Sequence, residues 1–106
     1  MIKDSEYHYK GSYVFQIVGK RHPEKLAKFV PISKIREIAV ETGKSKRIED
    51  VKYSIKLIKV CFNQMKDEEI KSDLKQIKRA VYPRIADSNE WKAVIVEMEL
   101  MIKSVE

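Results

Sequence analysis

The chain has 106 residues, 43% of them hydrophobic and 36% charged, so it is long enough for one hydrophobic core, too short for two and too apolar for a disordered chain. Its net charge of +6 comes from residues 1–47, which hold 11 Lys and Arg against 5 Asp and Glu, since residues 48–106 hold 11 of each. Cys61 is the single cysteine, so an internal disulfide is excluded. No apolar run approaches the ~18 residues that span a bilayer, so a membrane-spanning helix is excluded as well. Together these features predict a cytoplasmic protein.

Residues 6–18 have the pattern of a β-hairpin. Gly11 can supply the positive φ of a short turn between residues 6–9 and 13–18, which are rich in aromatic and β-branched side chains. Residues 26–32 would add a third strand, although the prolines at positions 23 and 31 also fit a short helix. Of the two, the sequence favours the strand.

From Ser33 onward the apolar residues recur at helical spacing. We expect Ser33 to cap a first helix and Gly43 to follow its last turn. A second helix over about residues 49–65 has so wide an apolar arc that it should be the central one. A third should occupy about residues 66–81, and a fourth should begin near residue 87 with a start like a capping box.

The low counts of three Gly and three Pro also favour helices over an all-β fold. The sequence therefore predicts an α+β fold in a single domain over residues 1–106. Residues 1–32 would be a basic, β-rich segment with a small antiparallel hairpin or three-stranded meander. Residues 33–106 would be a mainly helical body of about four helices.

The tripeptide Gly43-Lys44-Ser45 matches the end of a phosphate-binding loop, but the match is accidental. That loop needs a glycine five residues before its Gly-Lys pair, where this chain has Ile38 inside an amphipathic helix. A helix-turn-helix fits better, because Ala39 is small enough for two helices to cross closely. However, the second helix is too apolar for a major groove and presents no Asn, Gln or Arg to read bases. The sequence therefore favours an ordinary helical hairpin with a basic turn.

Two groups of side chains could hold a polyanion such as nucleic acid. The first is the cations of the turn, Lys44, Lys46 and Arg47. The second lies on the expected sheet, where rings could stack bases and cations could hold phosphates. Its members are Tyr9, Tyr13, Lys10, Lys20 and Arg21. The alternatives are that the rings form the core face of the sheet and that the lysines only keep the surface soluble.

Patterns typical of catalytic and metal sites are poor. His8 and His22 have no Cys or acidic partner at the spacing of a zinc site. Cys61 lies among apolar residues, where burial would raise the pKa of its thiol and make it a weaker nucleophile. We therefore expect a protein that is not an enzyme and that binds no metal or cofactor.

The C-terminal helix carries a stripe that could meet a partner. Trp91, Val94, Met98 and Met101 recur at the spacing of a helix seam, and Trp and Met are frequent at adaptable interfaces. The stripe could form a homodimer or dock on a larger complex. It could equally pack inside its own domain, as most helices of a short chain must.

The leading hypothesis is a non-enzymatic nucleic-acid-binding or regulatory protein, of phage or mobile-element type, that binds DNA or RNA through its basic N-terminal half. The alternative is a protein-interaction module, such as an inhibitor or accessory subunit, that uses the apolar face of the C-terminal helix. In that case the basic half would serve solubility or meet an acidic protein surface. Neither hypothesis involves a membrane.

Overall fold

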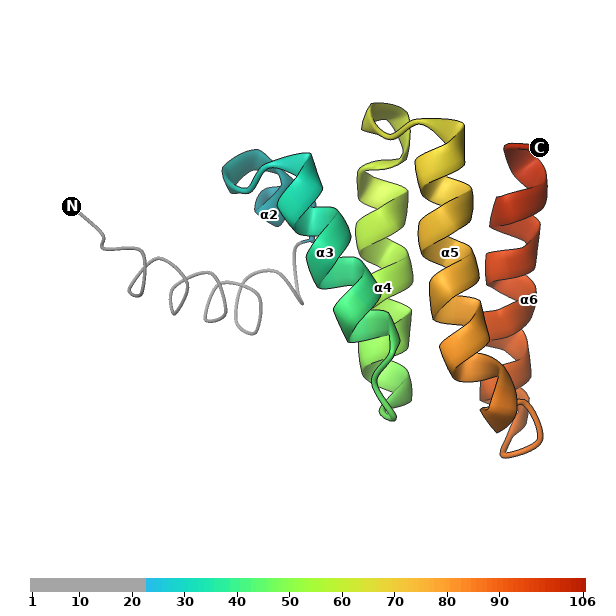
Figure 1. Cartoon of the computed structure of the whole chain (residues 1–106). Coiled ribbons are helices and arrows are strands. Elements are labelled where there is room, and N and C mark those ends of the chain that lie inside the picture. The colour runs from blue at the N-terminus through green and yellow to red at the C-terminus, as the bar shows by residue number, and fades with distance from the viewer. Residues whose placement is uncertain (1–22) are drawn as a thin grey trace.

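The computed structural model describes residues 23–106, which form helices joined by short turns (Figure 1). The α-helices in this part of the chain are α2 (Pro23–Phe29), α3 (Ile32–Gly43), α4 (Ile48–Val60), α5 (Asp67–Val81) and α6 (Asn89–Ser104). The short 3-10 helices η2 (Phe62–Gln64) and η3 (Tyr82–Arg84) follow α4 and α5.

The expected α+β fold is wrong, because the segment that should complete the sheet is helical. α2 covers most of it, and no residue between 23 and 106 is in a strand. Pro23 stands at the start of α2, where its missing N–H is not needed, and Glu24 and Lys28 complement the helix dipole at the two ends. Leu26 is fully buried, so this short helix directs its apolar side chain toward the core. The hairpin expected over residues 6–18 lies outside the described residues.

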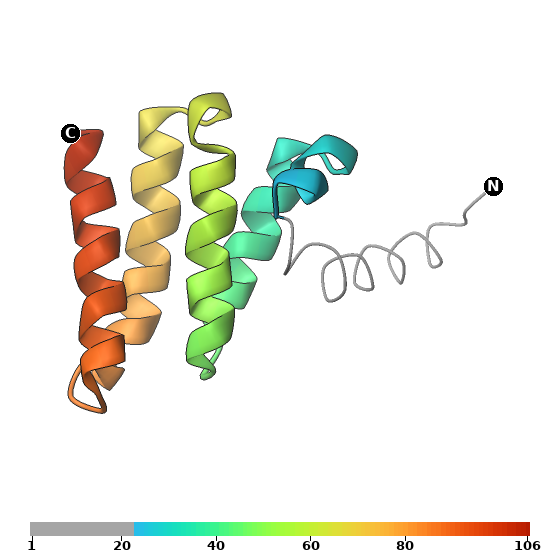
Figure 2. The ribbon, with the colours of Figure 1, turned by 180° about the vertical axis from the view of Figure 1, so that it is seen from behind.

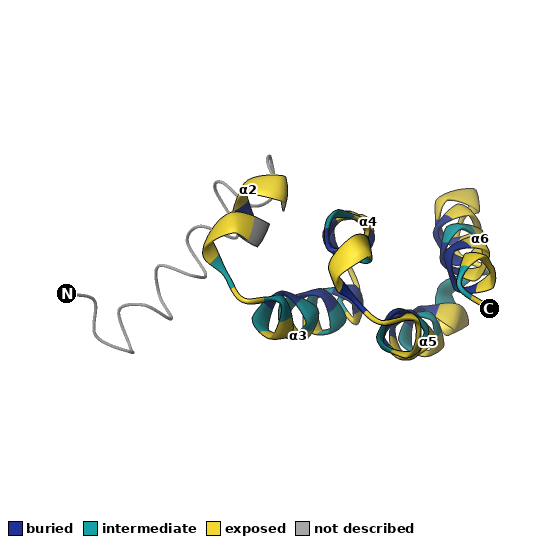
Figure 3. Ribbon diagram, turned by 90° about the horizontal axis from the view of Figure 1, so that it is seen from above, coloured by how far each residue is buried: buried dark blue, intermediate teal, exposed yellow. Residues whose placement is uncertain are grey.

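The helices lie in two layers. α3 and α5 form one layer, and α2, α4 and α6 form the other (Figure 3). α3 packs against α4 and α5, α4 packs against α2 and α6, and α5 packs against α6. Successive helices from α3 to α6 run in opposite directions, so the C-terminal ends of α3 and α5 lie at the same end of the bundle (Figures 1 and 2).

α4 is the central helix, as its wide apolar arc predicts. Nearly all of its turns bury side chains, among them Val51, Leu57 and Ile58. It ends at Val60, before the predicted end near residue 65, where the chain turns through η2 toward α5. Ser54 is also buried, and its hydroxyl donates a hydrogen bond of 2.6 Å to the carbonyl oxygen of Ala39. This bond joins α3 and α4 where the small Ala39 allows a close crossing.

Two helix starts differ slightly from the expected ones. α3 starts at Ile32 with Pro31 as its N-cap, so Ser33 is already helical and exposed. α6 is capped by Ser88, whose hydroxyl accepts a hydrogen bond of 3.4 Å from the backbone N–H of Trp91. In both places the cap is one or two residues from the predicted one, within the usual scatter of helix ends.

Gly43 has a role that the sequence does not reveal. It is the last residue of α3, and no glycine of the described region has a positive φ. Instead, Gly43 is buried against α5, where an added Cβ would lie 2.7 Å from Cγ1 of Ile77. The residue is small because α3 and α5 touch there, and the turn geometry expected of a residue after the helix does not apply.

Candidate nucleic-acid interface

α5 is an amphipathic helix with a well-defined start and a narrow buried stripe. Acidic residues occupy its first turn, where the helix dipole favours them, and Glu69 accepts a hydrogen bond of 2.8 Å from the backbone N–H of Lys66. Ile70, Leu74 and Ile77 are fully buried at helical spacing. Because the buried stripe is narrow, most of the circumference of α5 faces solvent.

The solvent face of α5 carries a row of cations that ends in an aromatic ring. Lys71, Lys75 and Lys78 recur at the spacing of one helix face, and Arg79 lies beside them. The backbone N–H of Tyr82 donates to the carbonyl oxygen of Lys78, so the helical spacing continues to Tyr82. We call this region the α5 surface. Its members are Lys71, Ser72, Lys75, Gln76, Lys78, Arg79 and Tyr82.

Beyond its first turn, α5 places no acidic residue on the α5 surface. Asp73 is the one acidic residue of α5 beyond its first turn, and its side chain is 4% exposed and faces α3. Lys78 pairs with Glu99 of α6 at 3.0 Å. In contrast, Lys71, Lys75 and Arg79 form no ion pair with any residue from 23 to 106. The α5 surface is therefore positively charged.

The lysines of α4 provide the opposite case. Lys52 pairs with Glu90 at 2.8 Å, and this hydrogen bond raises the pKa of Lys52. Lys59 pairs with Glu97, one heptad further along both helices. α4 and α6 run in the same direction and lie in one layer, so both pairs bridge them (Figures 1 and 3). Two lysines of this face, Lys52 and Lys59, thus have acidic partners, whereas the three cations of α5 named above have none among the described residues.

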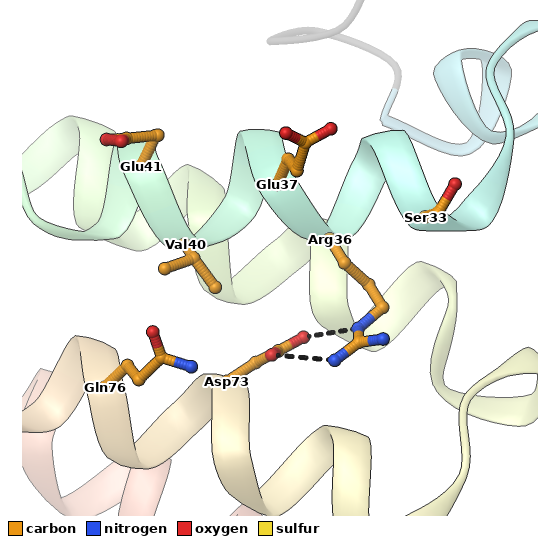
Figure 4. A pocket seen from close by; sticks show the side chains of 7 residues that line it. All are labelled: Ser33, Arg36, Glu37, Val40, Glu41, Asp73 and Gln76. Atoms are coloured by element: carbon orange, nitrogen blue, oxygen red, sulfur yellow. Dashed lines mark hydrogen bonds and ion pairs between the residues drawn. The ribbon is translucent and has the colours of Figure 1, made fainter.

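A groove lies between α3 and α5, at the edge of the α5 surface. Its volume is about 380 Å³, and it is lined by Ser33, Arg36, Glu37, Val40, Glu41, Asp73 and Gln76. Figure 4 shows Arg36 of α3 reaching across to Asp73 of α5. Its Nε lies 2.8 Å from Oδ2 and its Nη2 3.1 Å from Oδ1, while Nη1 lies 2.8 Å from Oε2 of Glu69. The hydrogen bonds to Asp73 raise the pKa of Arg36, and its donors are engaged within the protein.

The three predicted cations of the turn after α3 lie together and are exposed. Lys44, Lys46 and Arg47 form no ion pair within the described part of the chain. Ser45 orders the turn, because its hydroxyl donates to Oδ2 of Asp50 at 2.8 Å and accepts from the N–H of Arg47 at 3.0 Å. The contact between Gly43 and α5 places this turn at the end of the bundle where α5 ends (Figure 1).

The other predicted contacts with nucleic acid cannot be placed beside them. Lys10, Lys20, Arg21, Tyr9 and Tyr13 lie outside the described residues. The structure therefore brings together one of the two predicted groups, the cations of the turn.

The four predicted partner residues are in the core. Trp91, Val94, Met98 and Met101 are all buried against the other helices, so a partner could reach them only by displacing part of the bundle. Arg84 covers the ring of Trp91 with its guanidinium carbon 5.6 Å from the ring centroid. The exposed apolar side chains of α6 are instead on its opposite face.

The cations of α5 are candidate binding residues that the sequence analysis did not name. The net charge of residues 48–106 is zero, so this segment gave no sign of a basic surface. A net charge does not say which face of a helix each charged residue occupies. The spacing of Lys71, Lys75 and Arg79, four residues apart, is visible in the sequence and was the signal that could have revealed them.

Other chemical groups are few. No group of three or more His, Cys, Asp and Glu side chains within residues 23–106 is arranged to hold a metal ion. Burial raises the pKa of the Cys61 thiol, which lies in the core. Helices α2 to α6 are too short or too polar for any of them to cross a membrane. Comparison with models of known protein families, with curated proteins and with solved structures finds no match to this chain.

Proposed function

We propose that this chain is a non-enzymatic nucleic-acid-binding protein that contacts phosphates through the α5 surface. The observation that supports the proposal is the separation of charge on α5. Lys71, Lys75 and Arg79 are unpaired among the described residues and share one solvent face, while Asp73 of the same helix faces the protein interior. A row of unpaired cations favours a polyanion, and nucleic acid is a common one. Lys44, Lys46 and Arg47 would add a second contact at the end of the bundle.

The row is long enough to follow a nucleic-acid strand for several nucleotides. Eight residues separate Lys71 from Arg79, which is about 12 Å along a helix. Three cations of this kind should hold about three phosphates. Counterion release then predicts that affinity falls roughly 20-fold for a single strand, and roughly 40-fold for a duplex, between 50 and 200 mM salt.

Replacing Lys71, Lys75 and Arg79 together by Gln should reduce affinity at least about tenfold at 50 mM salt and flatten its salt dependence. We would measure fluorescence anisotropy of labelled single-stranded DNA, duplex DNA and RNA. The matched control is Lys52, Lys56 and Lys59 of α4 replaced by Gln, which removes the same net charge from another face. Equal losses in the two triple variants would reject the α5 surface and leave only a nonspecific effect of net charge.

The turn can be tested in the same assay. Replacing Lys44, Lys46 and Arg47 by Ala should weaken binding to all sequences by a smaller factor than the α5 variant does, since Glu41 and Glu49 lie close to this turn in the sequence. Unchanged binding would remove the turn from the interface. No binding of any probe by the unmodified protein at 50 mM salt would remove the proposal as a whole.

A protein-interaction module is a second candidate, and one observation favours it. Val96 and Leu100, four residues apart on the solvent face of α6, are 50% and 62% exposed. This is the face opposite the one expected from the sequence, and a second copy of the chain could pack there. If it does, the mass measured by light scattering should rise with protein concentration and return to that of a monomer after Val96→Ser and Leu100→Ser. A monomer at all concentrations would reject self-association.

A further inference from the structure

We propose that the α5 surface binds single-stranded nucleic acid, with one unpaired base stacked on the ring of Tyr82 and the adjoining phosphates held by Lys75 and Arg79. This inference rests on the proposed function and adds to it the class of ligand. It comes from the position of one exposed aromatic ring at the end of the row of cations.

Tyr82 is placed to take part in the same surface as the cations. Its backbone N–H donates to the carbonyl oxygen of Lys78, as in the helix before it, so residue 82 follows Lys75 and Lys78 on one face. The side chain is 52% exposed, whereas Tyr53 and Trp91 are buried in the core. About half of the surface of Tyr82 is therefore in water, on the helix face that carries the cations.

The backbone around Tyr82 is held by its neighbours. Pro83 follows directly, within η3, and the N–H of Ile85 donates to the carbonyl oxygen of Tyr82 at 3.0 Å. Arg84 donates from Nη1 to the carbonyl oxygen of Ala80 at 3.3 Å and also covers Trp91. These contacts hold the backbone of the turn, so the conformational freedom lost when a base stacks should be mainly that of the Tyr82 side chain.

The combination of ring and cations distinguishes a single strand from a duplex. A base can stack on a side chain only if one of its faces is free, and the bases of a duplex already stack on each other. Cations alone would hold either form, because both present phosphates. The aromatic ring should therefore add affinity for single strands only.

The test compares three single substitutions in the full chain on three labelled probes at 50 mM salt. The probes are 12-nucleotide oligo(dT), 12-nucleotide oligo(U) and a 12-base-pair DNA duplex. Tyr82→Ala should weaken binding to at least one of the single strands by about fivefold or more and change duplex binding less than twofold. Tyr82→Phe keeps the ring and should bind as the unmodified protein does. Phe29→Ala removes an exposed ring from α2, which α3 and α4 separate from α5 (Figure 1), and should have no effect.

Three results would overturn the inference. They are an equal loss of single-strand and duplex binding in Tyr82→Ala, a loss in Tyr82→Phe as large as in Tyr82→Ala, and unchanged single-strand binding in Tyr82→Ala. The triple Gln variant of Lys71, Lys75 and Arg79 separates the two proposals. If that variant binds all probes less tightly while Tyr82→Ala does not, the phosphate contacts stand and only the stacked base is rejected. Circular dichroism of each variant verifies that its helices are intact.

Discussion

Replacing Arg36 by Met should lower the free energy of unfolding by about 3 kcal/mol. The substitution keeps an apolar stem and removes the guanidinium that meets Asp73 through two hydrogen bonds of 2.8 and 3.1 Å. Asp73 is 4% exposed, so its carboxylate would stay buried without its partner. Arg36 itself is 28% exposed, which places the expected loss at the lower end of the range for buried pairs. Urea unfolding followed by circular dichroism measures it.

Two variants show whether the loss comes from the uncompensated carboxylate. Arg36→Met with Asp73→Leu removes both charges and should recover most of the stability, because apolar pairs often replace buried ion pairs at little cost. Lys34→Ala breaks the exposed pair with Glu37 on the same helix, at 3.7 Å, and should change stability by less than about 0.5 kcal/mol. If the double variant is no more stable than Arg36→Met, the unpaired carboxylate of Asp73 is not the cause of the lost stability.

The contacts between α3 and α5 also determine which face of α5 meets solvent. Arg36 holds Asp73 inward, and Gly43 lets α3 rest against Ile77. With these two points fixed, the row of Lys71, Lys75 and Arg79 must face outward. Stability and the proposed binding are therefore linked. The Asp73 carboxylate anchors α5 to α3, and because it faces inward it adds no negative charge to the α5 surface.

The helices of the body could be predicted because their apolar periodicity is strong. The wide arc of α4 correctly indicated a central helix, and α5 and α6 lie within a few residues of the expected positions. α2 could not be predicted in the same way, since seven residues between two prolines hold too few apolar positions to show a period. Leu26 is fully buried there, and one buried apolar position fits a strand or a helix equally.

The candidate interface was harder to predict than the fold. Assigning charge by segment placed the predicted interface in the N-terminal half. It took no account of the position of each charge on its helix, which decides which charges of the described residues are paired. Lys52 and Lys59 look available in the sequence but are paired with Glu90 and Glu97, which are 38 residues away. Such long-range pairs depend on the packing of α4 on α6, and no local pattern reveals them.

Replacing Gly43 by Ala should lower the free energy of unfolding by about 1–3 kcal/mol, although Ala is the better helix former by about 1 kcal/mol. The new Cβ would lie 2.7–2.8 Å from Cγ1, Cγ2 and Cδ1 of Ile77, closer than atoms in contact can be. Ile77 is fully buried and β-branched, so it cannot rotate out of the way. The clash should therefore outweigh the gain in helix propensity.

The effect of Gly43→Ala on the free energy of unfolding should change sign in a chain that already carries Ile77→Ala, because all three clashing atoms are gone and a cavity remains for the new methyl group to enter. There, Gly43→Ala should be neutral or stabilising by up to about 1 kcal/mol in the same urea unfolding experiment. If Gly43→Ala destabilises both backgrounds equally, the contact with Ile77 is not the reason for the glycine.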